Sequence, residues 1–261
     1  MSFDPASLDF KRLGPPPGAK VVVAGGCGGI GRSVVKACIE TGLRTTVLDL
    51  AESHRRHPSP NEADFVAIDA HEETSIVAAF EEIRVDGEID ALINLVGYRD
   101  DLINVGERDT ESWDDIISGN LRSAFLICRH GLAHMAANSA IVNVSSGLAV
   151  RVLPGYAPYS AAKAGVIALT KGIAIENAPR VRANAVAPAA VKTAFLAGGT
   201  GRVDDEDGDW DGQFSGYIKS IPMDRLAVAE DIVGPILFLA GPASCFMTGQ
   251  VLYVNGGGLT P

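Results

Sequence analysis

The chain has 261 residues, of which 47% are hydrophobic and 21% charged, and this composition excludes a disordered or fibrous protein. Its length provides a core that needs neither disulfides nor a structural metal. Its net charge of −10 argues against a protein that binds nucleic acid, because a phosphate backbone is held by clustered Lys and Arg side chains.

The chain begins with a segment of different character. It ends in a Gly-Pro-Pro-Pro-Gly run at 14–18, which is too stiff to join a helix or a central strand. No composition break or linker follows it. We therefore expect an N-terminal extension over 1–18 and a single domain over 19–261.

From residue 19 the chain alternates short β-branched apolar runs with longer amphipathic stretches. The runs show little polar alternation, which is typical of strands covered on both faces in a parallel sheet. The pattern predicts an α/β fold, with a doubly wound, mainly parallel seven-stranded sheet and helices on both faces. The expected strands are 20–24, 44–48, 65–68, 91–96, 140–144, 181–187 and 251–254. The expected helices lie near 29–41, 72–84, 110–137, 157–177 and 229–240.

The first expected strand runs directly into a glycine-rich turn, and a helix follows near residue 32. Glycines at such a turn let the backbone approach a pyrophosphate, whose charge then lies at the helix N-terminus. A glycine-rich stretch has this meaning only between a strand and a helix, and this one has that context. The residues expected to contact a dinucleotide here are Gly25, Cys27, Gly28, Gly29, Ile30 and Gly31.

The second expected strand ends at Asp49, which is followed by Leu50. A carboxylate at this position accepts hydrogen bonds from the adenosine ribose hydroxyls and repels the 2′-phosphate of NADP. We therefore expect NAD as the cofactor. The basic residues at 54–56 could face the adenosine end and favour NADP instead. Asp49 could also serve only as a helix N-cap or a solvated strand end.

A third group of residues has the pattern of an acid–base site. Tyr159 and Lys163 are four residues apart in a helical pattern, which places them on one helix face. A nearby ammonium, together with a positive nicotinamide ring, favours the phenolate and lowers the tyrosine pKa. Ser146 follows the strand at 140–144, so it should lie at the edge of the sheet where open α/β folds bind ligands.

With these residues in this order, the sequence resembles the short-chain dehydrogenase/reductase family over about 19–258. The glycine turn is similar to the family's cofactor motif, and 94–97 is similar to its Asn-Asn-Ala-Gly motif. The segments at 248–250 and 255–257 are similar to its C-terminal motif. Besides the turn and Asp49, the positions that the resemblance implies for cofactor binding are Leu50, Asp69, Ala70, Asn94, Val96, Gly97, Tyr159, Lys163, Pro188, Ala189, Val191 and Thr193.

The resemblance also implies the catalytic residues and the fold. It implies a Rossmann-like sheet, a homotetramer and four catalytic positions: Asn120, Ser146, Tyr159 and Lys163. In this scheme Ser146 and Tyr159 hydrogen-bond the substrate oxygen, and Tyr159 exchanges the proton. Lys163 lowers the tyrosine pKa and binds the nicotinamide ribose. Asn120 holds a water that links Lys163 to solvent.

Residues about 194–220 are rich in Gly, Asp and aromatic residues and have no clear period, which is typical of an active-site lid. Its four aromatic residues could line an apolar substrate pocket, or some could only anchor the lid. Part of a calcium-loop pattern starts at Asp207, but Ile218 stands where a bidentate Glu is required. The His pairs at 54 and 57 and at 130 and 134 have no third ligand in register. We expect no metal site.

Four cysteines, Cys27, Cys38, Cys128 and Cys245, are scattered without a Cys-x-x-Cys pair. We interpret them as buried thiols in a reducing compartment. The first ten residues lack a basic start with an apolar run, and no window holds 18 uninterrupted apolar residues. The sequence predicts a cytoplasmic protein with no signal peptide and no membrane contact.

The sequence therefore predicts an NAD-dependent oxidoreductase that interconverts a small or cyclic secondary alcohol and a ketone. Within the enzymes, the alternative is an NADPH-preferring 3-oxoacyl-thioester reductase, and Asp49 is the feature against it. From another class, the alternative is a catalytically silent dinucleotide-binding sensor, which need not retain all four catalytic positions.

Overall fold

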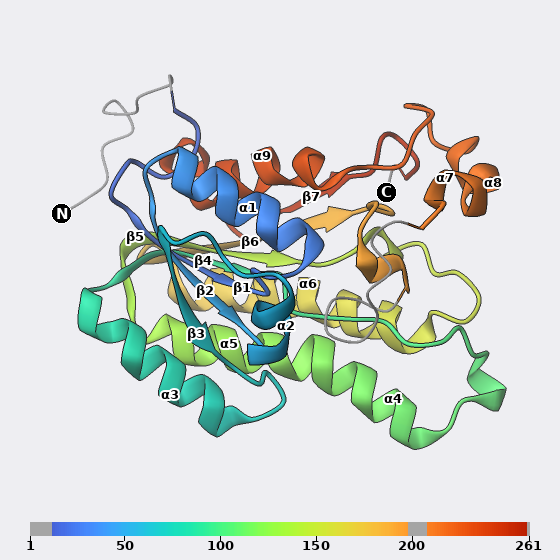
Figure 1. Cartoon of the computed structure of the whole chain (residues 1–261), viewed down its shortest axis with the longest axis horizontal. Coiled ribbons are helices and arrows are strands. Elements are labelled where there is room, and N and C mark those ends of the chain that lie inside the picture. The colour runs from blue at the N-terminus through green and yellow to red at the C-terminus, as the bar shows by residue number, and fades with distance from the viewer. Residues whose placement is uncertain (1–11, 198–207, 260–261) are drawn as a thin grey trace.

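The apolar runs of the sequence form one parallel sheet in the computed structural model, which describes residues 12–197 and 208–259. The sheet has seven strands in the order β3-β2-β1-β4-β5-β6-β7 (Figure 1). Every residue of β1 and β6 is buried, as expected for strands covered on both faces. The strands are β1 (Lys20–Ala24), β2 (Arg44–Asp49), β3 (Ala63–Ala67), β4 (Ile89–Asn94), β5 (Met135–Val144), β6 (Val181–Pro188) and β7 (Val251–Val254).

Helices cover both faces of this sheet (Figure 1). One core cluster joins the sheet to α1 (Gly29–Glu40) and α9 (Ala229–Ala240), which also pack against each other. The other core cluster joins the opposite face to α3 (Glu73–Ile83), α5 (Ser123–Leu132) and α6 (Ala157–Asn177). The α/β, doubly wound fold predicted from the sequence is therefore confirmed.

The expected single helix over 110–137 is wrong in two respects. The structure has α4 (Thr110–Ile117), a π-helical turn (Ser118–Arg122) and α5, and α5 ends at Leu132. The residues after it belong to β5 because their backbone pairs with both neighbouring strands, Met135 opposite Ile89 and Ser139 opposite Val181. Strand pairing outweighs the helical pattern of the sequence there.

The structure also has short helices that the sequence analysis did not predict. After β2 the chain forms α2 (Ala51–Arg56), in which Glu52 pairs with both Arg55 and Arg56. In the lid segment it forms α7 (Trp210–Gln213) and α8 (Ser215–Ile218). None of these reaches the length at which the apolar period can be recognised in a sequence.

Residues 12–18 of the predicted extension are held against the domain, with the Gly18 N–H donating to Gly42 O at 2.8 Å. The remainder of the extension, 1–11, lies outside the described residues. All four cysteines are free, and three are buried as expected, while Cys245 is partly exposed.

Within 12–197 and 208–259, no group of three or more His, Cys, Asp or Glu side chains could hold a metal. His54 stacks on Phe65 with ring centroids 3.7 Å apart, and His130 bonds Glu73 Oε1 at 2.9 Å. None of the helices in this part of the chain is both long and apolar enough to cross a membrane.

The strand order reverses direction between β1 and β4, which places a crevice at the carboxyl ends of these two strands. Ligands of open α/β sheets bind at such a reversal. The fold therefore brings the ends of β1, β2, β4, β5 and β6 to one edge, where the predicted site residues follow.

Candidate active site

A cavity of about 510 Å³ opens at the carboxyl edge of the sheet. It extends from the glycine turn to the helix that carries Tyr159. Three predicted residues, Cys27, Asn94 and Asn120, do not line it and are buried behind its wall. The predicted residues that do line it are Gly25, Gly28, Gly29, Ile30, Gly31, Asp49, Leu50, Asp69, Ala70, Val96, Gly97, Ser146, Tyr159, Lys163, Pro188, Ala189, Val191 and Thr193.

The glycine turn packs so tightly that side chains would not fit. A Cβ on Gly31 would lie 2.1 Å from the Gly25 carbonyl oxygen, so the first turn of α1 folds back onto the end of β1. A Cβ on Gly29 would lie 2.5 Å from the Thr193 side chain. The open N-terminus of α1 therefore borders the cavity with bare backbone, which is the environment that binds a pyrophosphate.

Asp49 lies at the end of β2, beside this turn. Its carboxylate accepts hydrogen bonds from the Cys27 and Leu50 N–H groups, both at 2.8 Å. Burial raises the pKa of this carboxyl, and hydrogen bonds from the two backbone N–H groups and from the Ser53 and Cys27 side chains counteract that rise. Cys27 thus contributes its backbone, while burial raises the pKa of its thiol to about 12 and keeps it protonated. The acid is fixed in orientation and still faces the cavity.

Asp69 lies on the same side of the cavity, after β3. Its carboxylate Oδ1 accepts from the His71 N–H at 2.9 Å, which closes a short turn at the cavity edge. Two acidic residues, Asp49 and Asp69, therefore lie at the glycine-turn end. This is the end at which an adenosine would be bound if a dinucleotide follows the turn.

The two asparagines behind the wall hold the loop after β4. Asn94 accepts from the Val96 N–H at 3.2 Å and donates to Asn143 Oδ1 at 3.1 Å. Asn120, in the π-helical turn, donates to the Tyr98 carbonyl at 2.8 Å and accepts from the Tyr98 N–H at 3.2 Å. Both side chains thus fix the backbone that borders the cavity. π-helical turns of this kind occur often at functional sites.

Gly97 brings the loop after β4 close to the π-helical turn and to α6. Its φ of +152° suits glycine, and a Cβ there would lie 2.4 Å from Asn120 Oδ1 and 2.9 Å from Lys163 Nζ. Because Asn120 and Lys163 are both buried, neither could retreat from a larger side chain. The Asn-x-x-Gly stretch therefore lets the loop, the π-helical turn and α6 meet.

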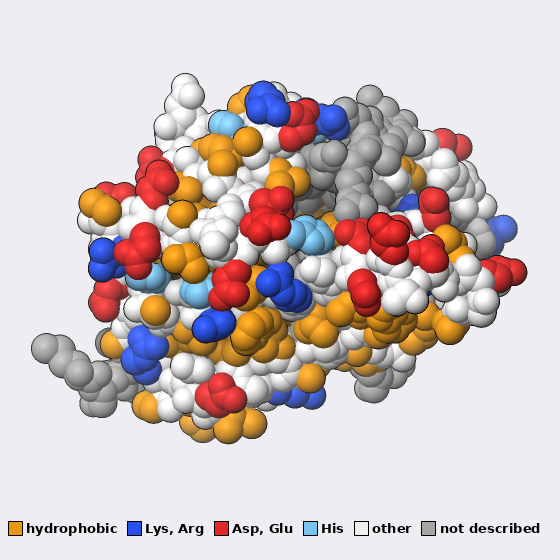
Figure 2. Space-filling view, turned by 90° about the horizontal axis from the view of Figure 1, so that it is seen from below, with side chains coloured by type: hydrophobic (Ala, Val, Ile, Leu, Met, Phe, Trp, Pro, Cys, Tyr) orange, Lys and Arg blue, Asp and Glu red, His pale blue; other side chains and the backbone are white. Residues whose placement is uncertain are grey.

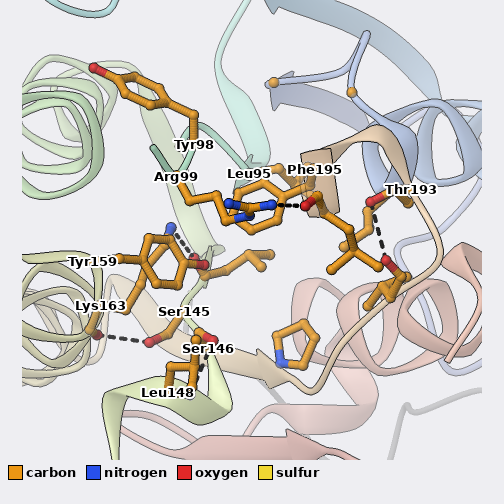
Figure 3. Close-up of a pocket in the computed structure, with 18 of the residues that line it drawn as sticks. Leu95, Tyr98, Arg99, Ser145, Ser146, Leu148, Tyr159, Lys163, Thr193 and Phe195 are labelled. Atoms are coloured by element: carbon orange, nitrogen blue, oxygen red, sulfur yellow. Dashed lines mark hydrogen bonds between the residues drawn. The ribbon is translucent and has the colours of Figure 1, made fainter. Parts of the chain in front are cut away.

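Ser146, Tyr159 and Lys163 come together in the cavity (Figure 3). Tyr159 and Lys163 lie on one face of α6, and the Lys163 Nζ is 5.7 Å from the Tyr159 ring centroid. The Lys163 Nζ donates to the Val144 carbonyl at 3.2 Å, which anchors it to the end of β5. The Ser146 Oγ accepts from the Leu148 N–H at 3.1 Å and also bonds the Tyr159 hydroxyl.

Burial dominates the protonation of this group. It raises the pKa of Tyr159 above its usual value of 10, against the lowering by the Ser146 hydrogen bond and the Arg99 charge. It lowers the pKa of Lys163 from 10.5 to about 8. Both shifts arise from loss of solvent on burial, and the expectation that Lys163, together with a positive nicotinamide ring, lowers the tyrosine pKa stays a prediction.

The comparisons with known proteins agree with this geometry. A family model described as enoyl-(acyl carrier protein) reductase matches residues 25–258, from the first glycine of the turn to the C-terminal motif. The chain belongs to the short-chain dehydrogenase/reductase family. It is thus an oxidoreductase of a family that uses nicotinamide dinucleotides.

Two curated relatives and one solved structure of this family illustrate its range. The chain is 33% identical to a 3-oxoacyl-[acyl-carrier-protein] reductase of Chlamydia pneumoniae, and the aligned residues cover 92% of this chain and 96% of that protein. It is 32% identical to a cis-4-hydroxycyclohexanecarboxylate dehydrogenase of Sinomonas cyclohexanicum, with coverages of 90% and 94%. A glucose/ribitol dehydrogenase from Brucella melitensis superposes with a TM-score of 0.84 at 25% identity, with coverages of 95% and 99%. Their names differ in substrate, so the substrate must be argued from this chain's own residues.

The aromatic residues of the predicted lid segment in this short-chain dehydrogenase/reductase have two different positions. Trp210 is buried with Ile221 and Leu226 in a small cluster, and so anchors the segment. Phe195, Phe214 and Tyr217 line the cavity, and the Phe195 and Tyr159 ring centroids are 5.6 Å apart. Residues 198–207, which include most of the acidic stretch and Asp207 of the calcium-like pattern, lie outside the described part of the chain.

Other cavity residues were not singled out from the sequence. Tyr98 and Arg99 directly follow Gly97, so their position after a strand end could have identified them. His71 follows Asp69 in the same way. Leu148, Arg151, Leu153 and Tyr156 lie between Ser146 and Tyr159, where the sequence has no period that distinguishes them.

The residues present fit a nicotinamide dinucleotide. The backbone of the glycine turn and the α1 N-terminus suit its pyrophosphate, and Asp49 suits its adenosine ribose. Pro188 to Thr193 follow β6 at the opposite wall, where the Ala189 N–H donates to Val254 O at 3.0 Å. The cavity then continues to Ser146 and Tyr159, so a bound dinucleotide can reach their hydroxyls.

Proposed function

We propose that this enzyme interconverts a secondary alcohol and a ketone, with NAD as its cofactor. The observation that supports the proposal is that one cavity is lined both by the residues suited to a dinucleotide and by the residues suited to proton transfer. Asp49 lies beside the glycine turn, and the buried Ser146, Tyr159 and Lys163 lie where the cavity continues. When bound, the nicotinamide dinucleotide supplies the hydride chemistry, while the protein supplies position and proton transfer.

Each catalytic side chain has a separate role in this proposal. The Ser146 and Tyr159 hydroxyls hydrogen-bond the substrate oxygen and stabilise the charge that develops on it. In oxidation Tyr159 takes the alcohol proton as a general base, and in reduction it returns the proton as an acid. Lys163, whose pKa is about 8, is mostly protonated at neutral pH and supplies a cation close to the tyrosine. Asn120 is a positioning residue, because its amide holds the Tyr98 backbone from both sides.

The preference for NAD rests on Asp49. Its carboxylate accepts from two backbone N–H groups and from the Ser53 and Cys27 side chains, and it lines the cavity where the ribose hydroxyls would be bound. The same negative charge opposes a 2′-phosphate. Of the basic residues that could have favoured NADP, Arg55 and Arg56 pair with Glu52, and His54 stacks on Phe65.

The alternative activity is an NADPH-dependent reduction of 3-oxoacyl thioesters. It is favoured by the name of the Chlamydia pneumoniae relative, which shares 33% of its residues with this chain. A catalytically silent sensor is disfavoured because Ser146, Tyr159 and Lys163 all face one cavity. A relative named for a hydroxycyclohexanecarboxylate, at 32% identity, supports a cyclic alcohol as the substrate class.

We further propose a homotetramer. Apolar side chains gather in a band across the face of the molecule seen in Figure 2. Trp113 of α4 and Phe125 of α5 are 36% and 43% exposed, and Ile175 of α6 is 83% exposed. Exposed apolar side chains on neighbouring helices are typical of a surface that another subunit covers.

The experiment that tests the proposed function follows the absorbance of the reduced nicotinamide. Purified protein is supplied with NAD or NADP and a panel of cyclic secondary alcohols, or with NADH or NADPH and ketones and 3-oxoacyl thioesters. We expect turnover of cyclic alcohols and ketones with NAD and NADH. Efficient turnover of thioesters with NADPH alone would replace the proposal with the alternative. Cofactor binding without turnover of any compound would favour the sensor.

A further inference from the structure

The cavity has opposite charge at its two ends. Its described acidic lining residues, Asp49 and Asp69, lie at the glycine-turn end. The substrate end is lined by aromatic and aliphatic side chains and by two arginines, Arg99 and Arg151. We propose that Arg99 binds a carboxylate of the substrate, so that the enzyme acts on alcohols and ketones that carry an acid group. This inference rests on the proposed function and names its substrate class.

Arg99 has donors to spare inside the cavity. It lies in the loop after β4, and Figure 3 shows it between Tyr159 and Phe195. Its Nη1 donates to the Asp100 carbonyl at 3.0 Å, and its Nη2 bonds the Leu196 carbonyl. Its Nε is buried and has no hydrogen-bond partner among the described residues. Of the five N–H donors of a guanidinium, three have no acceptor within 12–197 and 208–259, and a buried unpaired donor is costly.

Within the described part of the chain, the positive charge of Arg99 is also uncompensated. The carboxylate of the adjacent Asp100 pairs with Arg108, and only the Asp100 main-chain carbonyl faces Arg99. Among the described residues no ion pair of Arg99 occurs. An arginine in this state is suited to a bidentate carboxylate, which satisfies two N–H groups and the charge together.

The side chains around Arg99 indicate what the rest of the substrate, beyond its acid group, should be. Tyr156, Phe195, Phe214 and Leu153 line the same end of the cavity and offer apolar surface to a hydrocarbon body. Apolar walls exclude water and strengthen an ion pair formed inside them. Tyr159 lies close enough for the Arg99 charge to act on its hydroxyl. A substrate that presents its reacting oxygen to Tyr159 can therefore place an acid group at Arg99.

Arg151 has a different position. Its side chain is exposed, and its Nη1 donates to the Gly258 carbonyl at 3.0 Å. A cation at the rim attracts anions toward the opening, and this effect weakens with added salt. We therefore assign binding to Arg99 and attraction to Arg151.

The test compares an acid with its neutral counterpart. The probes are 4-hydroxycyclohexanecarboxylate and its primary amide, with kcat/KM measured with NAD. The matching oxo compounds are titrated against the protein–NADH complex by nicotinamide fluorescence. We expect the native enzyme to favour the acid by roughly 10- to 100-fold, mainly in KM. Arg99→Met should remove this preference, because kcat/KM should fall far more for the acid than for the amide.

Two further variants control the comparison. Arg99→Lys keeps the charge without the planar fork and should retain only part of the preference. Arg84→Met removes an arginine that is exposed and pairs with Glu81, far from the cavity lining, and should leave the preference unchanged.

Several outcomes would overturn the inference. Equal losses for acid and amide in Arg99→Met would mean that Arg99 only ties the loop to Leu196. No preference for the acid in the native enzyme would also contradict it. If neither alcohol is oxidised, the titration decides: Arg99-dependent binding of the oxo acid retains this inference while the proposed reaction fails, and its absence rejects the inference.

Discussion

The two ends of the cavity are built in different ways. At the glycine-turn end, β1, β2 and α1 place bare backbone and two carboxylates, and each position follows from a strand end. At the substrate end, side chains of loops, 3-10 turns and the short helix α8 form the wall. In the proposed function, backbone geometry therefore holds the cofactor, whereas individual side chains choose the substrate. Changes at the two ends should affect different kinetic quantities.

The largest effect on turnover is expected from a substitution of Tyr159, which lies where the two ends of the cavity meet. Tyr159→Phe removes the hydroxyl that transfers the proton and should reduce kcat by about 10³-fold. Binding of NADH, followed by fluorescence, should change only a few fold. Ser160→Ala is the matched control, because it removes a neighbouring hydroxyl of α6 that has no partner among the described residues. Turnover by Tyr159→Phe close to that of Ser160→Ala would contradict the mechanism.

The next largest effect tests the acidic end. Asp49→Asn removes the charge that opposes a 2′-phosphate and weakens the bonds to the ribose hydroxyls. The ratio of kcat/KM for NAD to that for NADP should fall by roughly 10- to 100-fold. Asp69→Asn makes the same chemical change one strand away and should affect both cofactors alike. An unchanged ratio in Asp49→Asn would show that another residue selects the cofactor.

The burial of Lys163 gives a prediction for stability. Its pKa is about 8 in the folded protein and about 10.5 in the unfolded chain. Between these values the unfolded chain binds more protons at this residue, so its contribution to the free energy of unfolding rises with pH. From pH 7 to 9.5 the native protein should gain about 2 kcal/mol relative to Lys163→Met.

Urea unfolding at both pH values, at a fixed protein concentration, measures this gain. Lys171→Met, which removes an exposed lysine of the same helix, should follow the native protein. A difference between the native protein and Lys163→Met that stays constant with pH would show that Lys163 is not desolvated in solution.

The smallest effect is expected on the outer side of the lid. Asp211 pairs with Lys192 at 2.6 Å, but the Asp211 side chain is 62% exposed. Because exposed ion pairs contribute little, Asp211→Asn should change kcat/KM by less than about 3-fold. Phe214→Ala, which opens the cavity wall from the same segment, should have a larger effect on KM. A larger effect of Asp211→Asn than of Phe214→Ala would mean that the lid acts through its charge and not through its apolar surface.

The same contrast explains what the sequence could predict. The apolar runs, the glycine turn and the Tyr-x-x-x-Lys spacing are local patterns with a fixed period, and all lie where they were expected. The end of α5 was misjudged because it depends on the pairing of Met135 with β4, which is a long-range contact. The rise of the Tyr159 pKa by burial could not be predicted, because desolvation depends on the packed surroundings and not on spacing.

Arg99 illustrates the same limit within the site. Its neighbour Asp100 suggests a local ion pair, yet the structure pairs Asp100 with Arg108 and leaves the Arg99 Nε buried without a partner among the described residues. Only the three-dimensional arrangement distinguishes an arginine available to a ligand from one that is paired.

The central claim is that the acidic end selects the cofactor and the basic end selects the substrate independently. A double-mutant cycle with Asp49→Asn and Arg99→Met tests it most directly, with kcat/KM measured for both cofactors and for the acid and amide probes. We predict that each variant changes only its own preference and that the effects multiply to within about 2-fold in the double variant. A loss of acid preference in Asp49→Asn, or of NAD preference in Arg99→Met, would contradict the division of the cavity.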